Sequence, residues 1–375
     1  MVATPWLRNS LAAQARAGSV TRRGTLIGLV GVGSALLVAH GRATSTVAHD
    51  RDDAARGDWR AFATRFVAAD GRVVDIGNGG VTHSEGQGYG LLFAEHFDDR
   101  ATFDSVLAWT RRGLKRPNDS LHSWRYRPGA AVPVDDPNNA TDGDLLIALA
   151  LLRAGQRWGS QRYVDLGCAI GADILANCVA EVGDAKVLLP AAFGFQHPGR
   201  VVINPSYYLF PALAALADYV PDPAWEALRA DGVRLLRRAR FGPARLPADW
   251  VQIDNGSLDR LAPAQGWPAR FGWDAVRVPL NLAWAGLTGE PALASAAAFW
   301  AGNEGPPAWV DLETGALAPY AACRGVAAVA ELTRAAHAGD AAPDLPHVAD
   351  TDDYYSAALV LLSRIAWRDS RRAAA

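Results

Sequence analysis

The sequence predicts an all-α protein, a single domain built as a toroid of helical hairpins, and three observations lead to this fold class. Apolar residues recur at the spacing of a helix through most of the chain after residue 54, whereas the alternation of a half-buried strand is scarce. The connecting segments carry Pro, Gly and Asp, and no Ser/Gly-rich linker or shift in composition divides the chain. The resulting domain is large for one core, and a ring of repeated hairpins accommodates that size.

Taken in order, eleven segments show the helical period. The segment 142–158 is apolar nearly all round, so we expect it to be buried on every side. The segment 222–239 carries four arginines, so we expect it to be half solvated. Such alternation is what an inner and an outer ring of helices would produce. The eleven segments are 55–68, 85–97, 101–113, 142–158, 160–179, 205–218, 222–239, 279–286, 290–302, 316–338 and 351–368.

The amino terminus has the pattern of an export signal. Arg22 and Arg23 stand just before an uncharged apolar run that ends at Ala39. This run is too short for the roughly 20 residues that a membrane-spanning helix needs, and the paired arginines resemble a twin-arginine signal. We therefore predict a signal peptide over residues 1–45 and a mature domain over residues 46–375 that is exported to the periplasm or the medium. The alternative is an uncleaved membrane anchor.

Composition narrows the class of ligand. The formal net charge is -2, from 37 basic and 39 acidic side chains, and no basic run is interleaved with aromatic residues. These features argue against nucleic acid as a partner, and the ligand is expected to carry little charge. The chain has 13 tryptophans, whose flat rings suit the apolar faces of sugars, although packing is the alternative reason for each. Three cysteines give no disulfide framework.

Two helix starts fit the capping box, in which a hydroxyl and a side chain three residues later exchange hydrogen bonds with the first turn. The segments 84–87 and 141–144 both have this pattern. It assigns Gln87 and Asp144 to capping. The acids at 85 and 142 are then left without a structural task.

Four side chains that could take part in catalysis or in binding stand at or near such helix starts, and a fifth lies close to them. In a toroid the inner helices run parallel, so their N-termini gather at one mouth and side chains far apart in sequence meet there. Each acid alone could simply complement a helix dipole, an effect worth about 0.3–1 kcal/mol, but several acids together favour a site. The residues expected to converge are Glu85, Asp142, Tyr207 and Asp274, with Arg277 close by.

Four segments resemble the motifs of glycoside hydrolase family 8, in the order expected for that family. The resemblance covers nearly all of residues 46–375 and implies an (α/α)6 barrel, which would be an inverting endo-glycanase. Most members are endo-β-1,4-glucanases, including the cellulase encoded beside bacterial cellulose synthases. The segments are His83-Ser84-Glu85-Gly86-Gln87-Gly88-Tyr89-Gly90, Ala140-Thr141-Asp142-Gly143-Asp144 with its continuation to Trp158, Asn204-Pro205-Ser206-Tyr207, and Trp273-Asp274-Ala275-Val276-Arg277-Val278-Pro279.

The resemblance also implies roles. Glu85 would be the proton donor, Asp142 would hold and distort the sugar at the cleavage point, although it is often recorded as the nucleophile, and Asp274 would be the base that activates water. Three further residues would line the site: Trp124, Tyr207 and Arg277.

The role of Glu85 as proton donor requires a raised pKa, whereas its position at a helix N-terminus lowers that pKa. In an inverting pair the acid and base carboxyl groups stand about 6.5–9.5 Å apart so that a water fits between them, and the acid must hold its proton. A helix N-terminus instead lowers the pKa of Glu85, by an effect worth less than about 1 kcal/mol. Repulsion from Asp142 and desolvation under a bound sugar are expected to outweigh it and raise that pKa.

Other polar residues near the motifs are expected to be structural. His83 and His122 should form hydrogen bonds rather than bind a metal, because no cluster of metal spacing accompanies them. Neither a metal nor a cofactor is expected. Four acids in polar or Pro-containing loops should be solvated or hydrogen-bonded: Asp135, Asp136, Asp249 and Asp254.

The expected substrate is a β-1,4-glucan, cut by a monomer that has a functional link to a cellulose synthase and no stable membrane span once the signal is removed. One alternative is another β-glycan, namely chitosan, xylan or mixed-linkage glucan. A chitosanase cleft should be rich in acids, and the net charge of -2 argues against it. The other alternative is a non-catalytic factor that binds exported glucan during assembly, which would not need all three acids.

Overall fold

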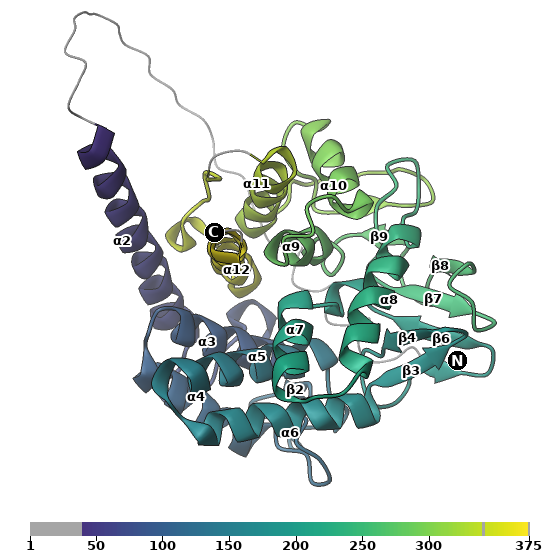
Figure 1. The fold of residues 1–375 in the computed structure, drawn as a ribbon, viewed down its shortest axis with the longest axis horizontal. Coiled ribbons are helices and arrows are strands. Elements are labelled where there is room, and N and C mark those ends of the chain that lie inside the picture. The colour runs from purple at the N-terminus through teal and green to yellow at the C-terminus, as the bar shows by residue number, and fades with distance from the viewer. Residues whose placement is uncertain (1–39, 340–341, 374–375) are drawn as a thin grey trace, which may run out of the picture. The chain divides into compact units, whose positions relative to one another are not determined.

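Helices build the fold, as the sequence predicts (Figure 1). The computed structural model describes residues 40–339 and 342–373. Contacts divide the chain after Gly57, and the features discussed below belong to the unit formed by residues 58–375. The α-helices in the described residues are α2 (His40–Phe66), α3 (Ser84–His96), α4 (Arg100–Gly113), α5 (Thr141–Trp158), α6 (Gln161–Asn177), α7 (Phe210–Tyr219), α8 (Ala224–Arg238), α9 (Arg277–Trp284), α10 (Pro291–Ala301), α11 (Arg324–Ala338) and α12 (Tyr354–Ala373).

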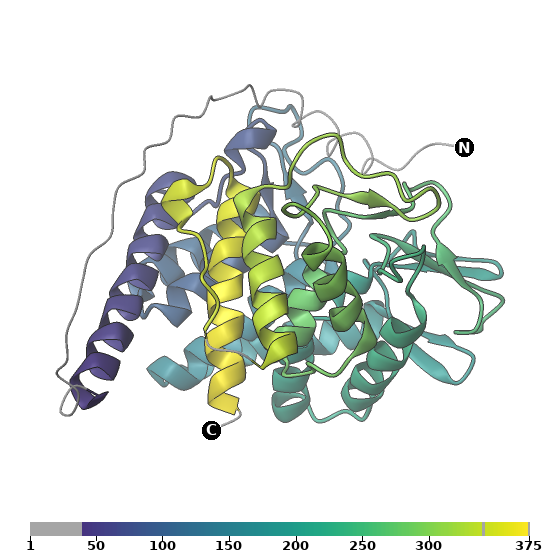
Figure 2. The ribbon, with the colours of Figure 1, turned by 90° about the horizontal axis from the view of Figure 1, so that it is seen from above.

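The helices pair as hairpins that close into a ring, which confirms the predicted toroid. Consecutive helices pack as α3 with α4, α5 with α6, α7 with α8, α9 with α10 and α11 with α12. Helices α3, α5, α7, α9 and α12 contact one another in turn, and α12 returns to α3. Figure 2 shows α11 and α12, in yellow-green and yellow, running side by side.

Aromatic packing closes the ring where its first and last helices meet. Phe62, near the end of α2, packs edge-on against Phe93 of α3 with ring centroids 5.1 Å apart. The same ring lies 6.2 Å from that of Tyr354, the first residue of α12. Phe62 is fully buried, so its contact with Tyr354 removes apolar surface from water. This burial stabilises the packing of two segments that are almost 300 residues apart in the sequence.

Burial distinguishes inner from outer helices as the sequence predicts. Helix α5 is buried along nearly its whole length, from Thr141 to Gly155. Helix α8 buries one face, with Trp225 fully enclosed, and leaves its arginines half-buried or exposed. An all-round apolar helix therefore lies inside the ring and an amphipathic one outside it.

Ten short strands in the described ranges were not predicted. None is longer than four residues, so none contains enough alternation to be recognised in the sequence. They lie in the connections between helices and form three antiparallel pairs and one four-stranded antiparallel sheet, β5-β6-β7-β8. The strands are β1 (Thr82–His83), β2 (Arg125–Tyr126), β3 (Val179–Val182), β4 (Ala185–Leu188), β5 (Gln196–His197), β6 (Arg200–Ile203), β7 (Val251–Asp254), β8 (Leu261–Pro263), β9 (Arg270–Phe271) and β10 (Val310–Asp311).

Several helices begin later or earlier than the sequence predicts, among them α2, which begins at His40 instead of 55, and α12, which begins at Tyr354 instead of 351. Helix α7 begins at Phe210 instead of 205, because Pro205–Tyr207 forms a separate 3-10 turn. Helix α11 begins at Arg324 instead of 316. Helix α9 begins at Arg277, two residues before the proline that was expected to start it, which places Arg277 in the first turn.

The predicted capping box at residues 84–87 is wrong. The Ser84 hydroxyl is buried without a hydrogen-bond partner in the described part of the chain. The Gln87 side chain accepts a hydrogen bond from the backbone N–H of Val73 at 2.6 Å and donates to Thr110 Oγ1 at 2.7 Å. Gln87 therefore ties α3 to α4 and to the preceding loop instead of capping its own helix.

The predicted capping box at residues 141–144 is also wrong. Thr141 Oγ1 donates to the carbonyl of Leu189 at 2.7 Å. The fully buried Asp144 accepts hydrogen bonds from His122 N at 3.0 Å, from His122 Nδ1 at 2.9 Å and from Asn139 Nδ2 at 3.0 Å. Asp144 thus anchors the connection between α4 and α5 to the first turn of α5, through partners 22 and 5 positions before it in the sequence.

The predicted signal peptide falls largely on residues 1–39, which lie outside the described residues. Its boundary at residue 45 stays a prediction. Among the helices that the structure describes, none is both long enough and apolar enough to cross a bilayer.

Candidate active site

One arginine brings together the three acids that the sequence predicts to converge. Arg277, the first residue of α9, forms ion pairs with Glu85 of α3, with Asp142 of α5 at 3.3 Å and with Asp274 at 2.6 Å. Glu85 and Asp142 share the nitrogen Nη1, whereas Asp274 takes Nη2. The guanidinium therefore stands between the Glu85 and Asp274 carboxylates and holds them apart, with all three helix starts at one mouth of the ring.

Two glycines allow α3 and α5 to approach closely enough for this arrangement. A Cβ atom on Gly143 would lie 2.6 Å from the backbone nitrogen of Glu85, and one on Gly88 would lie 2.6 Å from Leu146 Cβ. Neither separation is possible for real atoms, so any larger residue would push the helices apart. The glycines of the two motifs thus set the distance between Glu85 and Asp142.

The acids are enclosed to different degrees. The exposed fraction of the side chain is 8% for Asp142, 23% for Glu85 and 26% for Asp274. Burial and the charge on Glu85 raise the pKa of Asp142 well above its usual value. Asp142 is therefore the acid in this group that burial most strongly favours in its neutral form.

The pKa of Glu85 is lowered in the ligand-free site. Burial alone would raise it, but the Arg277 guanidinium and a hydrogen bond with Asp142 outweigh burial and hold the pKa of Glu85 below its usual value. The rise expected from Asp142 and from desolvation under a bound sugar concerns the occupied site and stays a prediction, whereas in the ligand-free site this pKa is lowered. The reason is Arg277, which the sequence suggested only as a lining residue and which lies 192 positions away.

Arg277 and Asp274 stabilise one another's charge. Burial raises the pKa of Asp274, and the Arg277 guanidinium opposes that rise. Burial by itself would lower the pKa of Arg277, but the neighbouring Glu85, Tyr89, Asp274 and Asp142 raise it well above its usual value. The guanidinium therefore stays charged among the acids.

Tyr89 belongs to the site although the sequence analysis did not select it. Its hydroxyl donates to Glu85 Oε1 at 3.1 Å and accepts from Arg277 Nη1 at 3.3 Å. Tyr89 follows Glu85 by four positions on α3, so the two side chains lie on the same helix face. The spacing of four residues from Glu85 is the sequence feature from which Tyr89 could have been predicted as a site residue.

Tyr207 lies where the sequence predicts it, beside the acids. It is buried, and its pKa is raised well above the usual value by burial and by the charges of Asp142 and Asp274. The preceding Asn204 caps the turn as expected, since its Oδ1 accepts from the backbone N–H of Ser206 at 3.0 Å. Tyr207 is therefore held rigidly at the edge of the acid cluster.

Trp124 supports the start of α3. Its carbonyl accepts from the backbone N–H of Ser84 at 3.0 Å, and its ring lies parallel to that of His83 with centroids 6.0 Å apart. The indole donates to Asp136 at 2.9 Å, and the Arg125 guanidinium stacks at 4.3 Å from the ring. With 6% of its surface exposed, Trp124 is mostly part of the wall next to Glu85.

The remaining acids and histidines have structural partners. His122 bonds to Asp144, while burial lowers the pKa of His83 to about 4 and keeps it neutral. In the residues that the structure describes, no group of three His, Cys, Asp or Glu side chains is placed to hold a metal. The four loop acids are hydrogen-bonded or ion-paired: Asp135 with Arg125 and Arg127, Asp136 with Trp124, Asp254 with Gln252, and Asp249 with three backbone N–H groups.

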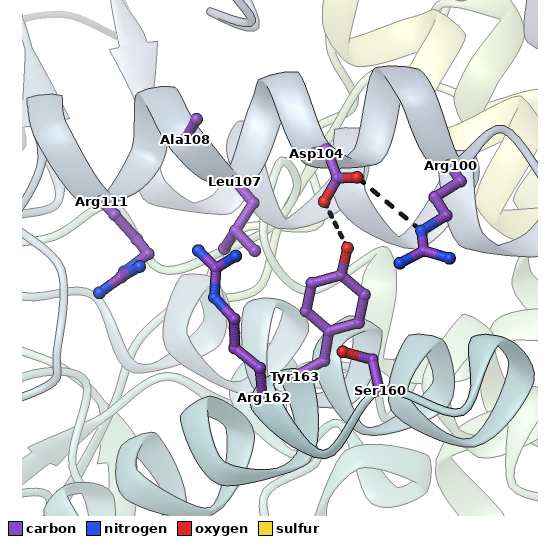
Figure 3. Close-up of a pocket in the computed structure, with 8 residues that line it drawn as sticks. All are labelled: Arg100, Asp104, Leu107, Ala108, Arg111, Ser160, Arg162 and Tyr163. Carbon is purple, nitrogen blue, oxygen red and sulfur yellow. Dashed lines mark hydrogen bonds and ion pairs between the residues drawn. The ribbon is translucent and has the colours of Figure 1, made fainter.

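Of two cavities in the described residues, the smaller is lined by an acid of the site and the larger is not. One of about 310 Å³ opens between α4 and α6, where Figure 3 shows Asp104 joined to Tyr163 and to Arg100, with Arg162 and Arg111 lining the same cavity, and no acid of the site lines it. A smaller one, of about 20 Å³, is lined by Tyr89, Asp142 and Arg277 among others. The cavity between α4 and α6 is therefore not the predicted site.

Comparisons with known proteins identify relatives of this chain. The model of the family described as "Glycosyl hydrolases family 8" matches residues 36–369. A "Probable endoglucanase" of Novacetimonas hansenii is 46% identical over 325 residues, which are 86% of this chain and 94% of that protein. An "Endoglucanase" of Cellulomonas uda is 38% identical over 280 residues, 73% of this chain and 76% of that protein.

Comparison with solved structures supports the same family and fold. The endo-beta-1,4-glucanase CMCax from Acetobacter xylinum superposes with a TM-score of 0.81 at 45% identity, over 85% of this chain and 99% of that one. The endoglucanase Cel10 from Klebsiella pneumoniae, a family 8 glycosyl hydrolase, gives 0.79 at 38% identity, over 84% and 99%. The match of sequence and fold shows that this chain belongs to glycosyl hydrolase family 8 and has the (α/α)6 barrel that the resemblance implied.

Proposed function

We propose that the chain is an inverting endo-β-1,4-glucanase, a cellulase, in which Glu85, Asp142 and Asp274 act together. The observation that carries the proposal is the position of these three carboxylates on one buried arginine. The relatives named as endoglucanases, at 46% and 38% identity over most of their length, support the choice of substrate.

In the proposed reaction one carboxyl group gives a proton to the leaving oxygen, and a second takes a proton from the attacking water on the opposite face of the sugar. Glu85 gives its proton to the glycosidic oxygen as the bond from that oxygen to the anomeric carbon breaks. Asp274 takes a proton from a water whose oxygen forms the new bond on the opposite face. The balance is one water consumed, the Glu85 proton transferred to the leaving oxygen and one proton of the water transferred to Asp274, after which exchange with solvent resets both groups.

Asp142 and Arg277 prepare the reaction without forming bonds to the sugar carbon. Asp142 is the most enclosed acid, so it suits the role of holding a distorted ring by a hydrogen bond that strengthens toward the transition state. Arg277 keeps Asp274 ionised and aimed. A sugar that enters between Arg277 and Glu85 weakens their ion pair, so the pKa of Glu85 rises when the acid must be protonated.

The choice of polysaccharide is tested by comparing substrates directly. We expect reducing ends to be released faster from carboxymethylcellulose than from chitosan, xylan or mixed-linkage glucan, with viscosity falling early because cuts are internal. Faster release from one of the other three would move the function to that glycan. A wild-type protein that binds cellulose but releases no sugar would support the non-catalytic assembly factor instead.

We also propose that the protein is exported by the twin-arginine route, on the pattern of Arg22 and Arg23 ahead of the apolar run. The double variant Arg22→Lys with Arg23→Lys should leave the precursor in the cytoplasm, as fractionation and immunoblotting would show. The matched control replaces Arg8 and Arg16 by lysine and should be exported normally. Equal export of both double variants contradicts the proposal.

The monomeric state and the functional link to a cellulose synthase stay predictions from the sequence.

A further inference from the structure

Asp249 lies just before β7 and faces the loop that leads into α9. Its backbone N–H donates to the carbonyl of Arg270 at 2.7 Å, which holds the two segments together. One carboxylate oxygen, Oδ1, accepts three backbone N–H groups: from Gly272 at 3.1 Å, from Asp274 at 3.1 Å and from Ala275 at 2.8 Å. The side chain is half-buried, so these bonds are partly shielded from water.

Three donors on one oxygen fix the backbone that carries Asp274. The donors come from residues on both sides of Asp274 and from Asp274 itself, so the bonds leave its Cα little freedom. The Asp274 carboxylate is held separately, by Arg277 Nη2 at 2.6 Å.

The loop is shaped to admit the Asp249 carboxylate. A Cβ atom on Gly272 would lie 3.0 Å from Asp249 Oδ2 and 3.3 Å from Trp309 Cβ, tighter than ordinary contacts. Glycine at this position therefore lets the acid reach the backbone. The placement has an electrostatic cost, because burial and the charge of Asp274 raise the pKa of Asp249 to about 7.

We propose that Asp249 is a positioning residue that sets the aim of Asp274 by holding the backbone of residues 272–275. This inference rests on the proposed function, in which Asp274 is the base. Asp249 itself touches neither the sugar nor the water. Its effect is on the direction in which the Asp274 carboxylate points, and misplacing a reacting group by about 1 Å can cost about 100-fold in rate.

The first test removes the acceptor. We expect Asp249→Ala to lower kcat by about 100-fold with little change in KM, because glucan contacts remain while the base is misaimed. Asp249→Asn keeps an oxygen at the same place and should recover most of kcat. Asp249→Glu keeps the charge but displaces the oxygen, and should recover less than Asp249→Asn.

The matched control is Asp99, which also accepts three hydrogen bonds and is also half-buried. It caps α4 through Thr102 N at 3.0 Å, Thr102 Oγ1 at 2.8 Å and Trp59 Nε1 at 3.2 Å. Asp99→Ala should lower Tm while kcat of the folded protein stays near the wild-type value. Rates are compared well below each Tm, with the folded fraction measured by circular dichroism.

The outcomes separate this inference from the proposed function. If Asp249→Ala lowers only Tm, as Asp99→Ala does, or if Asp249→Glu is more active than Asp249→Asn, the positioning role is overturned. The comparison of Asn with Glu decides the question even if the alanine variant does not fold. Asp274→Asn is measured in parallel: full activity there removes the base role, whereas an inactive Asp274→Asn beside a fully active Asp249→Ala refutes only the positioning role.

Discussion

Glu85→Gln should lower turnover by about 10²–10⁴-fold while the protein stays folded. Glutamine has nearly the same shape and can still accept a hydrogen bond from Arg277 and Tyr89, but it has no proton to give to the leaving oxygen. The loss should appear in kcat, because sugar contacts along the cleft are unchanged. Initial rates on a soluble cello-oligosaccharide and a thermal melt of the same preparation measure both effects.

Glu95→Gln is the matched control for this variant. Glu95 lies on the same helix, is 2% exposed, and pairs with Arg153 at 2.7 Å and Arg157 at 2.6 Å, near the opposite end of α3. Its replacement weakens a buried ion-pair network and should lower Tm, with kcat retained at low temperature. If Glu85→Gln kept most of its turnover while Glu95→Gln lost it, Glu85 would not be the proton donor.

Asp142→Asn and Asp144→Asn should separate activity from stability although the two acids stand in one helical turn. Burial and the charge of Glu85 already favour the neutral form of Asp142, so a neutral amide of nearly the same shape should leave Tm unchanged or raise it. Turnover should fall on the order of 10²-fold or more, because the lost contact strengthens as the ring distorts.

Asp144→Asn should have the opposite effect, a lower stability with part of the activity retained. Asp144 is fully buried and accepts three hydrogen bonds, two from His122 and one from Asn139. An amide can replace one oxygen but turns the other acceptor into a donor, which leaves a buried group unsatisfied at a cost of about 1–3 kcal/mol. Part of the activity should survive at low temperature. A stable, inactive Asp144→Asn and an unstable, active Asp142→Asn would exchange the two assignments.

Periodicity in the sequence predicted the helices, and shared helix starts predicted which acids would meet. Both succeed because a helical face and a helix terminus are local properties that tertiary packing then uses. The ten short strands were missed because segments of two to four residues have no measurable period. They matter for the site, since β1 leads into Glu85 and β9 leads into the Asp274 loop.

The capping boxes failed for a different reason. A hydroxyl at a helix start can bond to its own helix or to a remote carbonyl, and Thr141 bonds to Leu189, 48 positions away. The lowered pKa of Glu85 in the ligand-free site was not predicted for the same reason, since the sequence does not show that Arg277 pairs with it. Asp249 looked like an ordinary loop acid because its three partners are backbone groups of another segment.

The anomeric configuration of the first product tests the central assignment most directly. Proton NMR is recorded from the first turnovers on a soluble β-1,4-linked cello-oligosaccharide, before mutarotation mixes the anomers. Water delivered by Asp274 to the face opposite the leaving oxygen should give the α-anomer first, followed by a slow drift to the equilibrium mixture. Initial β-anomer would mean a retaining reaction, which would contradict the role of Asp274 as the base and with it the proposed mechanism.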